Sequence, residues 1–219
     1  MIFGETPVDA ATGSILAHSV KHRLGLFKKG RVLSSDDIRL LQESGVTAVF
    51  VARLAEDDIA EDEAAAAVAK AIAGAGAAVQ APFTGRANLH AAHRGLAVVD
   101  ADRVKAFNRI HESLTLATVP SHDLVEERQL IATVKVIPFA VANEVLVEAL
   151  DVIGSDPLIR VESFKHRRAG LVITRMPQTK ATIVAKSETA IRERIEALEG
   201  DVGEVIVVDH TIDDIRAAT

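Results

Sequence analysis

The sequence predicts an α/β protein in which an N-terminal mixed α+β domain with a β-rich region is followed by the start of a parallel α/β domain. Strand-like and helix-like segments alternate along the chain, and residues 125–139 include its most β-like stretch. Residues 171–219 predict a strand, a helix, a second strand and a second helix. Both strands of this tail are runs rich in Val and Ile without polar alternation, which is typical of parallel strands covered on both faces.

The length of 219 residues indicates one large domain or two small ones, at about 150 residues per domain. Gly154–Pro157 is a turn-rich segment, and we place the domain boundary between it and Arg168. The predicted domains are therefore an N-terminal α+β domain of residues 1–165 and an incomplete α/β domain of residues 166–219.

The first elements follow from short-range signals. Ile15–Val20 predicts a strand, and Leu26–Leu33 predicts a hairpin that turns at Gly30. Ser34 and Asp37 have the spacing of a capping box, which predicts the start of a helix. The β-branched run 46–52 then predicts a buried strand.

The middle of the chain begins with a cluster of acidic residues between 56 and 63, ahead of an alanine-rich helix over 64–73. Such a cluster fits either a cation site or the positive end of a helix dipole, and the spacing of a calcium loop is absent, which favours the dipole. The remaining predictions are strands over 79–83, 97–99 and 116–119, a polar loop over 84–89, a helix over 102–114, a β-rich segment over 125–139 that turns at 126–128, and a helix over 143–150.

Lys135 stands among apolar neighbours in the run Thr133–Phe139. Strand alternation explains it as an outward-facing residue. The alternative is a partly buried cation that awaits an anion.

The tail predicts strands over 171–174 and 205–208, a helix that ends at Gly200, and a last helix that begins at the Thr211–Asp214 capping box. Two strands do not complete a covered sheet. We expect the chain to be a fragment of a longer protein; the alternatives are that the N-terminal domain or a second subunit supplies the neighbours. Ligands of such sheets bind outside the carboxyl ends of the strands, here residues 174–180 and 209–210.

Composition excludes several functions. The net charge of −6 disfavours binding to nucleic acid or to anionic membranes, and aromatic residues make up only 3% of the chain. Cysteine is absent, which excludes thiolate ligands, and we expect no metal site among the eight histidines. Ser121, His122 and Asp123 are adjacent and cannot form a catalytic relay, so no catalytic residue is predicted. The chain has neither a signal peptide nor a membrane-length apolar run, which predicts a cytoplasmic protein.

Motifs along the chain carry a family resemblance. They are Lys28–Ser34 (KKGRVLS) with Asp37 and Ile38, Phe83–Leu89 (FTGRANL), Ala132–Val141 (ATVKVIPFAV), Ala169–Pro177 (AGLVITRMP), Lys186–Ser187, and Val205–His210 (VIVVDH). Together they resemble molybdopterin-binding proteins of molybdenum cofactor biosynthesis, which are related to molybdopterin molybdotransferase and in bacteria are often fused to a nucleotidyltransferase-like half. The resemblance extends over nearly the whole chain.

The resemblance implies that the tail is the first half of a three-layer molybdopterin-binding domain. Its ligand would be molybdopterin, a pterin phosphate, with Mg²⁺ where a nucleotide takes part. The implied ligand-binding residues are Thr174, Arg175, Lys180, Lys186 and Asp209. The family's glycine-rich loop after a third strand would lie beyond Thr219, as would a nucleotidyltransferase-like domain, so we expect no catalysis by this chain alone.

Two functions remain as hypotheses. The first is a molybdopterin-binding module in molybdenum cofactor biosynthesis. The second is a dimerisation or interaction module that positions a catalytic partner, with the segment Leu130–Val141 pairing across a two-fold axis of a homodimer.

Overall fold

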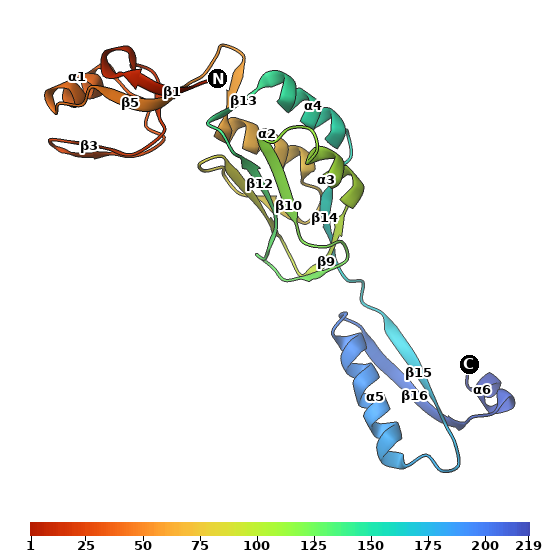
Figure 1. Cartoon of the computed structure of the whole chain (residues 1–219). Helices are drawn as coiled ribbons and strands as arrows, with labels where there is room; N and C mark the ends of the chain where they lie inside the picture. The colour runs from red at the N-terminus through yellow and green to blue at the C-terminus, as the bar shows by residue number, and fades with distance from the viewer. The chain divides into compact units, whose positions relative to one another are not determined.

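The computed structural model describes residues 1–219, which divide into two compact units, residues 1–162 and residues 163–219. Both units are mixtures of helices and strands (Figure 1). All the strand ladders of the first unit are antiparallel, and the second unit holds the parallel pair. No helix has the length and apolar character that crossing a membrane requires.

Residues 1–53 form a three-stranded sheet in the order β1-β5-β2, a separate hairpin and one α-helix (Figure 1). Val49 and Val51 of the sheet and Ile38 and Leu41 of the helix share one hydrophobic core. The elements are β1 (Ile2–Pro7), the 3-10 turn η1 (Val8–Ala10), β2 (Ile15–Leu16), β3 (Val20–His22), β4 (Gly25–Phe27), α1 (Ser35–Glu43) and β5 (Ala48–Arg53).

The predicted capping box at the start of α1 is confirmed. The Ser34 hydroxyl accepts from the Asp37 N–H at 3.2 Å, and the Asp37 carboxylate accepts from the Ser34 N–H at 3.1 Å. The same carboxylate, which is almost fully buried, accepts two hydrogen bonds of 2.9 Å from the Arg31 guanidinium. Asp37 therefore ties the chain before the helix to its first turn.

We expect Asp37→Asn to lower the free energy of unfolding at neutral pH by about 1 kcal/mol, because it removes the charge that pairs with Arg31. The loss is no larger because the half-exposed Arg31 is screened by solvent. The Arg31 guanidinium, with help from Ser34, holds the pKa of Asp37 below its ordinary value. This stabilisation is complete above the ordinary aspartate pKa and is lost as the pH falls through the lowered value. Urea titrations across acidic pH measure it, and Asp36→Asn, next to it but exposed, should change little.

The hairpin predicted to turn at Gly30 lies earlier in the chain. Its strands are β3 and β4, which pair from Val20↔Phe27 to His22↔Gly25. The chain turns at Arg23 and Leu24, where the Leu24 N–H donates to His22 Nδ1 at 3.3 Å. Gly30 does take the left-handed conformation of a turn, with φ +85°, but its turn leads back toward β2.

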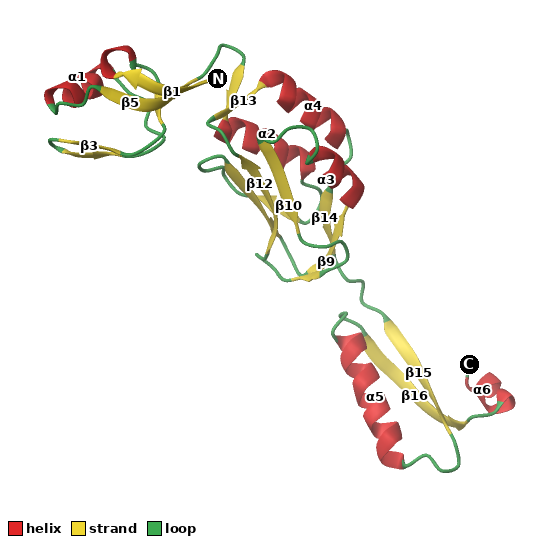
Figure 2. Ribbon diagram, in the orientation of Figure 1, coloured by secondary structure: helices red, strands yellow, loops and turns green.

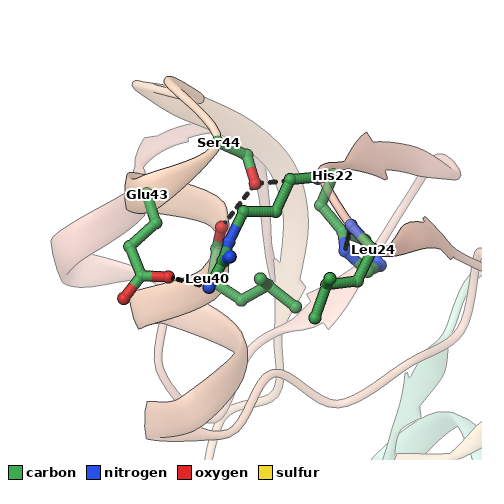
Figure 3. Close-up of polar contacts among 6 residues, drawn as sticks. His22, Leu24, Leu40, Glu43 and Ser44 are labelled. Carbon is green, nitrogen blue, oxygen red and sulfur yellow. Dashed lines mark hydrogen bonds and ion pairs between the residues drawn. The ribbon is translucent and has the colours of Figure 1, made fainter.

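The tip of this hairpin is bonded to the C-terminal end of α1 (Figure 3). The Arg23 guanidinium pairs with Glu43 at 2.5 Å, and the Arg23 N–H donates to the Ser44 hydroxyl at 3.0 Å. The Ser44 hydroxyl donates in turn to the Leu40 carbonyl at 2.6 Å. These contacts compensate for a hairpin that is too short to be stable alone.

Residues 58–162 pack helices against two antiparallel sheets (Figure 2). The sheets have the strand orders β10-β12-β8-β7 and β11-β9-β14, and a short pair joins β13 to β6. Ala64, Val68 and Ile72 of α2 are completely buried in the shared core. The elements are β6 (Asp58–Ala60), α2 (Glu61–Ile72), β7 (Ala77–Val79), β8 (Arg86–Ala91), β9 (Gly95–Val99), α3 (Ala101–Phe107), β10 (Leu114–Thr118), β11 (Leu124–Val125), β12 (Leu130–Val136), β13 (Ala140–Ala142), α4 (Asn143–Ile153) and β14 (Ile159–Glu162).

The polar loop predicted over 84–89 is wrong for residues 86–89, which belong to β8. This strand lies between β12 and β7 and buries every second side chain, namely Ala87, Leu89 and Ala91. The strand predicted over 79–83 is wrong for residues 80–83, because β7 ends at Val79 and shares only that residue with the prediction. Two of the three buried residues of β8 are alanines, and their weak apolar signal explains the error.

The helix predicted over 102–114 ends at Phe107, and Leu114 already belongs to β10. The turn predicted at 126–128 is present, but it does not join a hairpin, because β11 pairs with β9 while β12 pairs with β10 and β8. Of the segment Leu130–Val141 that we predicted to pair across a two-fold axis, the residues of β12 are hydrogen-bonded on both sides and offer no open edge, whereas β13 pairs with β6 alone.

The second unit contains the predicted order of strand, helix, strand and helix. Its two strands are parallel and aligned from Leu171↔Val205 to Arg175↔Asp209. Thr211 caps the last helix as predicted, since its side chain accepts from the Asp214 N–H. The sheet has two strands, so the three-layer arrangement that the resemblance implies is not seen. The elements are β15 (Arg168–Arg175), α5 (Ala181–Glu196), β16 (Asp201–Asp209) and α6 (Ile212–Ala218).

Candidate functional site

The structure brings three of the five predicted ligand-binding residues together at the carboxyl end of the parallel pair. Thr174 and Arg175 end β15, and Asp209 ends β16. Arg175 Nε lies 3.2 Å from Asp209 Oδ1, and His210 Nδ1 lies 2.9 Å from Thr174 Oγ1. We call these four residues the strand-end site.

The two predicted lysines lie on the helix that follows β15. Lys180 is the N-cap of α5, and its side chain is exposed without an acidic partner. The turn before it is tight, because Met176 N donates to Thr179 Oγ1 at 3.0 Å. Lys186 is exposed six residues further along α5, so Lys180 is the lysine at the end of the unit where the strand-end site lies.

The strand-end site offers hydrogen-bond donors for an anion, although the charge of Arg175 is already paired. Asp209 already neutralises Arg175, and both side chains of this pair are more than half exposed, which makes it weak. The N-terminal turn of α5 has no side-chain cap, and the Ile183 N–H already donates to the Lys180 carbonyl at 2.9 Å, so the N–H groups of Ala181 and Thr182 are the available donors. The hydroxyl of Thr174, the ammonium of Lys180 and these N–H groups form the donor set.

A second candidate site is the cleft of about 640 Å³ in the first unit. It combines exposed apolar side chains with several charged ones. We call it the Lys135 cleft, and its lining residues are Met1, Phe3, Ala17, His18, Lys29, Gly30, Glu61, Thr84, Lys135, Ile137, Pro138 and Phe139.

Both explanations considered for Lys135 hold in part. The residue alternates with the buried Val134 and Val136 of β12, as an outward-facing strand residue does. Its ammonium group nevertheless lines the cleft and donates to the Thr84 carbonyl at 2.9 Å. A lysine has three donors, so two remain for a ligand.

The Thr84 carbonyl belongs to a strained turn. Thr84 and Gly85 both have positive φ, 51° and 69°, in the two-residue turn between Phe83 and Arg86. The Gly85 N–H donates to the carboxylate of Asp62, in the first turn of α2, at 2.7 Å. Lys135 and Asp62 thus hold this turn from two elements, which fixes the edge of the cleft.

Lys29 and Glu61 bring opposite charges to the cleft. The Lys29 ammonium lies 5.3 Å from the centre of the Phe139 ring, a cation–π contact. Glu61 begins α2, and its N–H donates to the Phe139 carbonyl at 2.9 Å. Burial raises the pKa of the Glu61 carboxyl and the carboxylate of Asp62 raises it further, while the ammonium groups of Lys135 and Lys29 act in the opposite direction.

The raised pKa makes stability depend on pH with a definite sign. The folded chain holds a proton on Glu61 up to a higher pH than the unfolded chain does, so this residue lowers stability as the pH rises from its ordinary pKa through the raised value. We expect Glu61→Gln to remove that decline, so that its stability relative to wild type increases over this window. Urea titrations at several acidic pH values measure the difference. Glu63→Gln in the same helical turn is the control, and an identical pH profile for the two variants would contradict the assignment.

The cleft was not predicted as a site, although three motifs of the resemblance contribute to it. Lys29 comes from the motif 28–34, Thr84 from 83–89, and Lys135 to Phe139 from 132–141. Glu61 comes from the acidic cluster before α2, where Glu61, Asp62 and Glu63 occupy the first helical turn as the dipole explanation expects. No group of three or more His, Asp or Glu side chains in the structure has the arrangement of a metal site.

The comparisons with known proteins give one match. Residues 5–53, most of the first sheet and its helix, match a family model described as a domain of unknown function, DUF8806. No curated protein and no solved structure matches the chain.

Proposed function

We propose that the chain is a molybdopterin-binding module that acts in molybdenum cofactor biosynthesis in the cytoplasm. The observation that carries the proposal is the convergence of Thr174, Arg175 and Asp209 at the carboxyl end of two parallel strands joined by a helix. In open parallel sheets this end is where ligands bind. The motif resemblance of the tail supplies the identity of the ligand, a pterin phosphate.

The donor set suits the phosphate of such a ligand. The uncapped start of α5 presents backbone N–H groups and the positive end of a helix dipole to an anion. Lys180 adds an unpaired charge at the same end, and Thr174 adds a hydroxyl. Mg²⁺ would accompany the ligand where a nucleotide is attached to it.

We further propose that β15, α5, β16 and α6 belong to a parallel three-layer α/β domain. The support is the exposure of apolar side chains that such layers would cover: Ile183 on α5 is 55% exposed and Ile212 on α6 is 74% exposed. No residue of α5 or α6 is buried. In a complete sheet these helices would bury one face each.

Pterin fluorescence provides the test, with 6-hydroxymethylpterin phosphate and its dephosphorylated form as probes. We expect the full chain to prefer the phosphate ester, and Lys180→Met to weaken binding of the ester about tenfold, the equivalent of one charge-assisted hydrogen bond. Lys165→Met, an exposed lysine of the same unit, is the matched control. Equal binding of the two probes, or equal affinity in Lys180→Met and Lys165→Met, would contradict the proposal.

The second candidate is an interaction module that forms a homodimer. The observation that favours it is the same set of exposed apolar side chains in residues 163–219, together with the outer edges of β15 and β16, which pair with no other strand. Light scattering at micromolar concentration separates the candidates. A wild-type dimer that dissociates in Ile212→Asp supports the interaction module. A monomeric wild-type chain excludes it.

A further inference from the structure

The Lys135 cleft has an apolar lining that suits a flat ring. Phe3 and Ile137, which line it, are 55% and 63% exposed, while Pro138 and Phe139 are half-buried. Exposed apolar side chains gathered in a concave site gain free energy when a ligand removes them from water. Aromatic side chains in particular pack against planar rings.

The charged lining suits an anion. Lys29 and Lys135 have no acidic partner within ion-pair distance, and Glu61 is the single carboxylate among the lining residues. Met1 also lines the cleft, and its ammonium group is paired with Asp58 at 2.8 Å. The two lysines therefore outweigh Glu61, and the cleft has a net positive charge within a chain whose net charge is −6.

The size of the cleft limits the ligand. A volume of about 640 Å³ lies within the range of pockets that enclose small organic molecules, roughly 300–1,000 Å³. It exceeds what a free phosphate ion needs. A compound that fills it and satisfies both parts of its lining has a planar ring and an anionic group.

We propose that the Lys135 cleft binds a phosphorylated planar-ring compound of mononucleotide size, with the phosphate at Lys135 and Lys29 and the ring against Phe139 and Phe3. The Lys135 cleft lies in residues 1–162 and the strand-end site in residues 163–219. The present proposal therefore does not depend on the function proposed for the strand-end site. The phosphate takes the two free donors of the Lys135 ammonium, while the third donor stays on the Thr84 carbonyl. Glu61 opposes the phosphate by like-charge repulsion.

Calorimetric titration of the full chain with AMP, adenosine and inorganic phosphate tests the proposal. We expect AMP to bind, and adenosine and phosphate each to bind at least tenfold more weakly. Lys135→Met should weaken AMP at least tenfold and leave adenosine unchanged, whereas Lys135→Arg should keep most of the AMP affinity because it retains the charge. Phe139→Ala should weaken AMP and adenosine alike, and Glu61→Gln should tighten AMP severalfold.

Lys70→Met, an exposed lysine at the other end of α2, is the matched control and should bind AMP as the wild type does. Circular dichroism identifies any variant that does not fold. If Lys135→Met does not fold, the AMP affinities of the two single variants Lys135→Arg and Glu61→Gln test the dependence on charge. Absence of AMP binding, or equal affinity in Lys135→Met and Lys70→Met, would overturn the proposal. Lys180→Met should not change AMP affinity, so failure at one site is distinguishable from failure at the other.

Discussion

Phe107→Ala is expected to lower the free energy of unfolding by about 3 to 5 kcal/mol. Phe107 ends α3, and its side chain is completely buried in the core of residues 64–161. Removing the ring loses its burial from water and leaves a cavity that neighbouring side chains fill only in part. Urea titration monitored by circular dichroism measures the loss.

The matched control for this prediction is Phe83→Ala. The Phe83 side chain is 74% exposed, so the same deletion should cost less than about 0.5 kcal/mol. Equal losses in the two variants would show that Phe107 is not packed as described.

Gly85→Ala is expected to lower the free energy of unfolding by about 3 kcal/mol. A left-handed conformation costs a residue with a side chain about 1 to 2 kcal/mol, and Gly85 has φ +69°. A methyl group here would also lie 2.6 Å from the Val136 carbonyl oxygen and 2.6 Å from Glu61 Oε2. The carboxylate can rotate away, but the Val136 carbonyl is backbone, and the Val136 N–H donates to the Gly85 carbonyl at 2.7 Å, which holds the two residues together. Crowding of about 1 to 3 kcal/mol is therefore added.

Gly45→Ala separates the two parts of that cost. Gly45 has φ +75°, and a methyl group there would meet nothing within 4 Å, so only the conformational cost of about 1 to 2 kcal/mol should appear. Denaturant titration of both variants gives the comparison. If Gly85→Ala were no worse than Gly45→Ala, the close contact with Val136 would be refuted.

Local signals in the sequence were sufficient where neighbouring residues decide the structure. Ser34 and Asp37 predicted the start of α1, because a capping box involves only residues three positions apart. The parallel pairing of β15 and β16 followed from uninterrupted apolar runs separated by a helix. The proximity of Arg175 and Asp209 followed from that topology, because carboxyl ends of neighbouring parallel strands meet at one edge.

The predictions from the sequence were wrong or incomplete where contacts between distant residues determine the structure. The hairpin turn was predicted at Gly30 because glycine favours turns. Contacts of Arg23 with the end of α1 instead favour a turn seven residues earlier. The strand 86–91 was missed because sheet pairing on both of its sides, rather than its own apolar content, makes it a strand. The Lys135 cleft lay beyond local reasoning, since its lining residues come from positions 1 to 139 and only long-range packing gathers them.

The two hydrophobic cores of residues 1–162 have no side chain in common. Residues unfold cooperatively when their side chains are buried in the same core. We therefore expect each of the two cores to unfold as a separate local unit. Amide hydrogen exchange should therefore divide this unit into two classes of protection, with Val49 and Val51 in one and Leu89 and Val134 in the other. A ligand held between Lys29, in the part of the chain that forms the first core, and Lys135, on the outward face of a strand of the second, would join the two cores into one calorimetric transition.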